Sequence, residues 1–96
     1  MLITLAFNQE SAGAGMNYIS NAVQVFGDLG LQLQFSDTGT NNISLLTSMD
    51  GETFAEVYNE KGIRTIFSKP IRGFIPGMYV KVRTNTLPIS GKVLTE

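Results

Sequence analysis

The sequence predicts an all-β fold: a small antiparallel β-sandwich or jelly-roll-like barrel of about 7–8 short strands. Three observations lead to this prediction. Apolar and polar residues alternate in short runs, turn residues separate the runs at fairly regular intervals, and no segment carries a clear helical stripe. Alternation with a period of two turns one face of each strand toward a core and the other toward water. The length of 96 residues suits one small domain.

Two segments show the alternation most clearly. In residues 31–35, apolar side chains alternate with two glutamines. In residues 78–83, Val80 and Val82 are expected inside, and Lys81 and Arg83 outside. Similar patterns predict the remaining strands at residues 2–7, 22–26, 42–48, 54–58, 63–68 and 89–94. By the same alternation, we expect Phe54, Phe67, Ile89, Gly91 and Val93 to face the core.

Turn signals lie between these runs, at residues 27–28, 37–39, 50–51, 59–62, 76–77 and 85–88. We interpret Asp50-Gly51 as a structural turn. Gly51 would supply the positive φ of a tight hairpin. Glu52 and Glu56 would then lie on the wet side of the following strand, with Phe54 facing away from them.

The composition changes once, near the start of the chain. Residues 11–20 are small and polar and lack an apolar stripe, which favours a loop over a helix. We therefore divide the chain into an N-terminal strand or arm with a flexible loop, residues 1–20, and a β-sandwich domain, residues 21–96. Two interpretations of the first strand stay open: it pairs within its own domain, or it pairs with a neighbouring molecule.

The charge content argues against several partner classes. Charged residues make up 16% of the chain, against about 25% in typical soluble domains, and the net charge is −1 without a basic cluster. We therefore expect no nucleic-acid partner. The sequence contains no apolar stretch of about 20 residues, so we expect no membrane span. The first residues do not resemble a secretion signal. A weakly charged polar surface suits β-rich proteins that contact neighbours.

The inventory of reactive side chains predicts a protein that is not an enzyme. The chain has no His, Cys or Trp, which removes a Ser-His-Asp triad, a thiolate nucleophile and most transition-metal sites. Asp50, Glu52 and Glu56 could form a carboxylate pair or a calcium site, but the spacing of a calcium loop is missing. We expect no catalytic residues, metal, cofactor or small-molecule substrate.

Three stretches of the sequence resemble small β-sandwich modules in the virions of tailed bacteriophages. The first resembles a hairpin of the form S-x-D-G-x-x-(F/W)-x-x-V, matched by Ser48, Asp50, Gly51, Phe54 and Val57. The second resembles a late strand, G-x-Y followed by alternating apolar and basic residues, matched by Gly77, Tyr79, Val80, Lys81 and Val82. The third resembles a closing strand, matched by Ser90, Gly91, Lys92 and Val93. The likeness covers residues 23–95, and Phe54 stands where Trp is common.

The resemblance implies an auxiliary capsid or head-decoration subunit, located in the phage head and made in the cytoplasm of the bacterial host. Its partners would be the major capsid protein or other virion proteins, and a homo-oligomer such as a trimer is compatible with this role. We expect Met1–Phe7 to pair with a neighbour's sheet, or to lie in its own, and residues 72–76 to form a second contact. The candidate contact residues are Ile3, Leu5, Phe7, Arg72, Phe74 and Ile75.

An alternative function is recognition of a carbohydrate or a cell-surface protein by a fibre-like sandwich. The candidate aromatic residues for such a surface are Tyr58 and Tyr79, which we expect to point outward.

Overall fold

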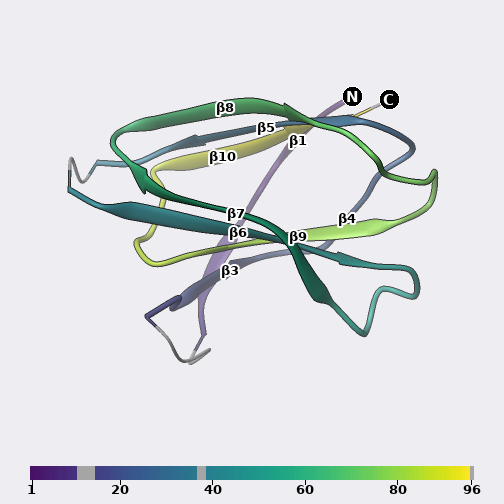
Figure 1. Ribbon diagram of the computed structural model, residues 1–96, viewed down its shortest axis with the longest axis horizontal. Helices are drawn as coiled ribbons and strands as arrows, with labels where there is room; N and C mark the ends of the chain where they lie inside the picture. Colours follow the sequence, from purple (N-terminus) through teal and green to yellow (C-terminus); the bar gives the residue numbers. More distant parts are fainter. Residues whose placement is uncertain (11–14, 37–38, 96) are drawn as a thin grey trace.

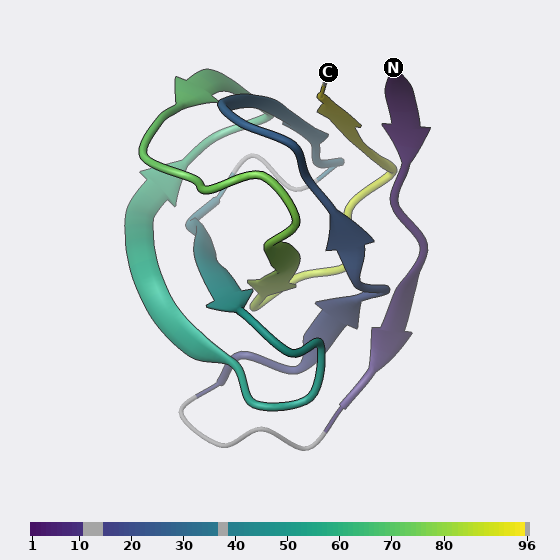
Figure 2. The same ribbon diagram turned by 90° about the vertical axis from the view of Figure 1, so that its right-hand side faces the viewer.

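The fold is all-β, as the sequence predicts. The computed structural model describes residues 1–10, 15–36 and 39–95, and these residues form ten strands in two sheets packed face to face (Figures 1 and 2). The described residues contain no helix long and apolar enough to cross a membrane. The strands are β1 Leu2–Thr4, β2 Phe7–Gln9, β3 Tyr18–Ser20, β4 Val23–Gln24, β5 Leu29–Gln34, β6 Asn41–Ser48, β7 Ala55–Ile63, β8 Ile66–Ile71, β9 Tyr79–Thr84 and β10 Ser90–Leu94.

Every strand pairing is antiparallel. The four-stranded sheet, called sheet A here, has the order β1-β10-β5-β8. The six-stranded sheet, sheet B, has the order β2-β3-β9-β6-β7, and β4 pairs with β9. Because neighbouring strands in space are mostly distant in the chain, sequence-distant segments build each face of the sandwich.

The core lies between the sheets, where the alternating residues meet. Leu31 and Leu33 from β5 are 1% and 0% exposed, and Val80 and Val82 from β9 are 1% and 0% exposed. The predicted inward faces of these two strands are therefore confirmed. Gly91 in β10 faces the same interior. An added Cβ there would lie 2.9 Å from both Leu33 Cδ2 and Phe7 Cε1, so these two side chains would have to shift to admit it.

The first residues contribute a strand to each sheet. β1 pairs with β10 in sheet A, and β2 pairs with β3 in sheet B. Leu5 lies between these strands and is 6% exposed within the core. Residues 11–14 of the expected loop lie outside the described residues, and the end of that segment, Tyr18–Ser20, forms β3.

The predicted turn at residues 59–62 is wrong, because β7 runs through it to Ile63. The pairing with β6 shifts register between Asn41 and Ile43, so that Lys61 and Gly62 stand opposite the single residue Asn42. Gly62 has a φ of 75°, which is the geometry of a β-bulge. The Asn and Gly signals therefore mark a bulge, and the chain turns at residues 64–65.

Two predicted core residues lie elsewhere. Ile89 precedes β10 and is 62% exposed. Phe54 is half-buried, and the Nζ atom of Lys81 lies 4.6 Å from the centre of its ring. Lys81 is on the outward face of β9, so Phe54 covers the outside of sheet B instead of filling the core.

Candidate functional site

Three loops meet at one end of the sandwich, on the right in Figure 1. They are residues 25–28 between β4 and β5, 49–54 between β6 and β7, and 72–78 between β8 and β9. We call this surface the loop end. It gathers the predicted turn Asp50-Gly51 and the predicted contact residues of the β8–β9 loop.

The β6–β7 loop is held by the side chains of Ser48 and Asp50. The Asp50 carboxylate accepts hydrogen bonds of 2.9 Å from the backbone N–H groups of Glu52 and Thr53. The Ser48 hydroxyl donates to Asp50 at 2.7 Å and accepts the N–H of Gly51 at 2.9 Å. Gly51 has the predicted positive φ, 81°, but the connection spans residues 49–54 and is longer than a tight hairpin. These bonds make the loop a single ordered unit.

The hydrogen bonds in this loop also set the charge of Asp50. The Thr53 and Glu52 N–H groups, followed by the Ser48 hydroxyl, lower the pKa of Asp50 to about 2. The carboxylate is thus ionised at neutral pH and acts as a turn cap. A general acid needs a pKa near the operating pH, so the geometry gives Asp50 a structural role.

The β8–β9 loop is fixed mainly by backbone hydrogen bonds to the β4–β5 connection. The N–H of Gly77 donates to the carbonyl of Val25, and the N–H of Val25 donates to the carbonyl of Met78, both at 2.7 Å. The N–H of Gly73 donates to the Asp28 carboxylate at 3.2 Å. Both ends of the loop are therefore anchored to the β4–β5 connection.

Large apolar side chains stay exposed on these ordered loops. Met49 is 80% exposed and Ile75 is 62% exposed. Together with Pro76, Gly77 and Met78 they line a hollow of about 200 Å³. The sequence analysis selected Ile75 but missed Met49. The only sequence signal for Met49 is that it is an apolar residue directly before the Asp50-Gly51 turn.

The other predicted contact residues lie in different environments. Within the loop end, Arg72 is exposed, and Phe74 packs partly buried against the core. In the N-terminal segment, Leu5 belongs to the core, and Ile3 and Phe7 pack against it. Their side chains face their own domain in this structure, so a neighbour approaching β1 would meet its open edge and the outward side chains Leu2 and Thr4.

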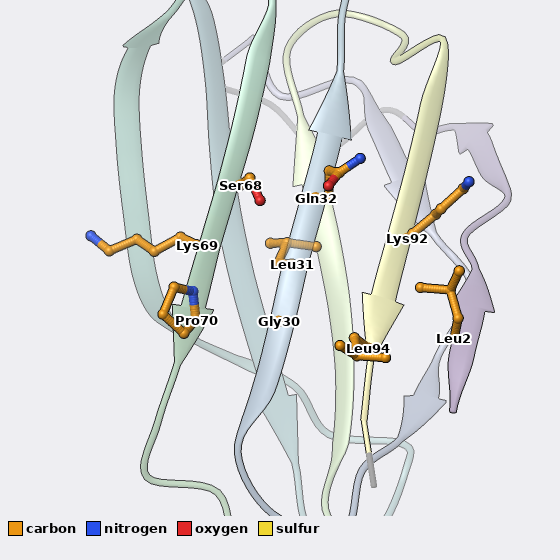
Figure 3. Close-up of a pocket in the computed structure, with 9 residues that line it drawn as sticks. All are labelled: Leu2, Gly30, Leu31, Gln32, Ser68, Lys69, Pro70, Lys92 and Leu94. Atoms are coloured by element: carbon orange, nitrogen blue, oxygen red, sulfur yellow. The ribbon is translucent and has the colours of Figure 1, made fainter.

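A second surface is the outer face of sheet A. Figure 3 shows the residues that line a hollow of about 430 Å³ on this face, with Gly30 among them. Leu94 lies on one side of Gly30 and Pro70 on the other, while Gln32 and Lys92 form the next row. The sequence did not predict this face because it depends on the register of four strands.

Two kinds of reactive cluster are relevant among the described residues, a metal site and a Ser-Lys pair. Among residues 1–10, 15–36 and 39–95, no three acidic side chains lie close enough together to hold a metal ion. Ser68 and Lys69 are neighbours in β8, but the Lys69 ammonium bonds to the Tyr58 hydroxyl at 3.1 Å. The candidate site consists of two surfaces, the loop end and the outer face of sheet A.

Comparison with models of known protein families, with curated protein sequences and with solved structures found no match.

Proposed function

We propose that this chain is a structural subunit that docks on a larger protein assembly through its loop end. The observation that carries the proposal is the pair of exposed side chains Met49 and Ile75 on loops fixed by hydrogen bonds. A preordered apolar surface loses little conformational freedom on binding, so its burial contributes directly to affinity. Isolated exposed apolar residues are common, but here two of them line one hollow.

The charge around the loop end indicates which partner surface fits. Its residues include the carboxylates of Asp28, Asp50 and Glu52 and one guanidinium, Arg72. The partner would place an apolar side chain in the hollow and basic groups around it.

In its specific form, the proposal is an auxiliary capsid or head-decoration subunit of a tailed bacteriophage, with the major capsid protein as partner. The support for this form is the resemblance of the three sequence stretches described above. A shell presents many equivalent positions, so a modest contact repeated at each of them stabilises the assembly through avidity.

The alternative, recognition of a carbohydrate, has less support. Tyr58 and Tyr79 are both half-buried. The Lys69 ammonium lies 5.1 Å from the centre of the Tyr58 ring, and the ring of Tyr79 lies beside Gly51. A stacking surface for a sugar needs an open ring face, which these two tyrosines do not supply.

The test is co-sedimentation of the purified protein with heads of the encoding phage that lack it. We expect saturable binding at a fixed number of copies per head. Ile75→Asp should weaken binding by about tenfold or more, since a charge would replace a central apolar contact. Leu87→Asp is the matched control, because Leu87 is 55% exposed in the β9–β10 connection at the opposite end of the sandwich.

Two results would contradict the proposal. One is the absence of saturable binding by the unaltered protein. The other is equal binding by the Ile75→Asp and Leu87→Asp variants, provided that both give the amide NMR dispersion of the unaltered protein.

A further inference from the structure

The outer face of sheet A carries an apolar row that crosses all four strands. The pairing registers place Leu2 beside Leu94, Leu94 beside Gly30, and Gly30 beside Pro70. Leu2 and Leu94 are 60% and 57% exposed. The row lies at right angles to the strands, and its surface belongs to neither the core nor the loop end.

Gly30 makes a hole in this row, directly beside a projecting side chain. A Cβ added to Gly30 would have only Leu94 Cβ within 4 Å, at 3.7 Å. Its backbone does not have the positive φ that requires glycine. Since neither close packing nor backbone conformation explains the glycine, the hollow of about 430 Å³ above it is available to an incoming side chain.

We infer that this face binds a second copy of the chain, with sheet A packed against sheet A. The twofold axis runs parallel to the strands, between β10 and β5. Each Leu94 then lies over Gly30 of the partner subunit and fills its hollow, while each Leu2 lies over Pro70 of the partner subunit. One surface supplies both the projection and the hole, which is what a twofold interface requires.

The polar groups of the face are compatible with this arrangement. The next row contains Thr4, Lys92, Gln32 and Ser68. The same axis places Lys92 opposite Gln32 of the partner subunit, whose amide oxygen can accept its hydrogen bond. The side-chain ammonium of Lys92 forms no ion pair or hydrogen bond with any described residue. An axis running across the strands would instead stack Leu94 on Leu94 and leave both hollows empty.

The size of the face indicates a weak dimer. Strands of 3 to 6 residues, spaced about 4.8 Å apart, give a face of about 300 Å² per subunit. A stable interface buries about 800 Å² per partner. We therefore expect a dissociation constant on the order of 0.1–1 mM, so that pairs form where a common surface concentrates the subunits. The inference stands on sheet A alone and does not depend on docking by the loop end.

The test is NMR of the purified protein between about 0.05 and about 2 mM. The unaltered protein should show concentration-dependent amide shifts at Leu2, Gly30 and Leu94, with slower translational diffusion at the higher concentration. Gly30→Val fills the hole and should abolish both effects while keeping the fold. Ala55→Val is the control, since it places the same valine side chain at an exposed position of β7 in sheet B.

A charge pair of variants tests the orientation. Gln32→Lys should weaken dimerisation at least tenfold, because two lysines from each subunit would then meet. Gln32→Glu should preserve or strengthen dimerisation. The difference in affinity between the two variants should shrink in high salt. Concentration-independent shifts in the unaltered protein, persistent self-association of Gly30→Val, or tighter association of Gln32→Lys than of Gln32→Glu would each overturn the inference. Because no phage head is involved, failure here is distinct from failure of the proposed function.

Discussion

The Nζ atom of Lys69 in β8 donates a hydrogen bond of 3.1 Å to the hydroxyl of Tyr58 in β7. β8 is an edge strand of sheet A and β7 an edge strand of sheet B, so this bond joins the two sheets where the sandwich is open. The Tyr58 hydroxyl donates in turn to Glu60 at 2.5 Å, and the Lys69 ammonium lies 3.7 Å from the same carboxylate. These three side chains form a polar clasp over the edge of the core.

Loss of the hydroxyl in the clasp should lower thermal stability. Tyr58→Phe keeps the ring but removes the acceptor of the Lys69 bond and the donor to Glu60, so we expect the melting temperature to fall by a few degrees. Tyr79→Phe is the control, because no described residue bonds to the Tyr79 hydroxyl. Thermal unfolding followed by circular dichroism measures both, and equal melting temperatures would show that the clasp contributes nothing.

Acid should destabilise the fold through the β6–β7 loop. The pKa of Asp50 is lowered to about 2 from 3.8, so its contribution to stability is complete above about pH 4 and is lost as the pH falls toward 2. A carboxyl-carbon NMR titration should give a value near 2. In Ser48→Ala the titration should move upward, because one donor to the carboxylate is gone. A value of 3.8 in the unaltered protein would contradict the hydrogen bonds described for this loop.

Gly51 should tolerate substitution poorly, in contrast to its neighbour. Gly51→Val puts a β-branched residue at a φ of 81° and a Cβ 3.4 Å from the Tyr79 ring, so we expect a loss of about 1–3 kcal/mol in the free energy of unfolding. Asp50→Asn keeps an oxygen that can accept the two N–H bonds and should lose less. Urea unfolding measures the free energy of unfolding of both variants. Loss of head binding by a folded Asp50→Asn variant would contradict the structural role of Asp50.

The two sheet-A glycines with different surroundings should respond in opposite ways to alanine. Gly91→Ala forces Leu33 and Phe7 apart in the core, and we expect a destabilisation of about 1–3 kcal/mol. Gly30→Ala meets ordinary contacts and should stabilise the monomer by about 0.5–1 kcal/mol by restricting the unfolded chain. The free energy of unfolding is measured in urea, at a protein concentration well below that at which dimers form. Similar free energies for both variants would contradict the burial assigned to Gly91.

The sequence predicted those parts of the fold that depend on local alternation. The strands around Leu31 and Val80 and their inward faces follow from a period of two. The bulge at Gly62 could not be told from a turn, because both use the same positive-φ glycine chemistry and only the pairing with Asn42 distinguishes them. Phe54 was misplaced because it precedes β7 instead of lying within it, so the strand's alternation does not govern it.

The candidate surfaces were harder to predict than the strands. Ile75 was found because it lies in a conspicuous loop, but its neighbour Met49 comes from a different loop. The row formed by Leu2, Leu94, Gly30 and Pro70 combines four strands from both halves of the chain. Such surfaces depend on strand order and register, which no short window of sequence encodes.

The most direct measurement of the central claim is a cryo-electron microscopy map of phage heads with and without this protein. The account predicts added density shaped as a small two-sheet sandwich at equivalent positions, with the loops around Met49 and Ile75 against the shell. Identical maps with and without the protein, or a sandwich whose loop end points away from the shell, would contradict it.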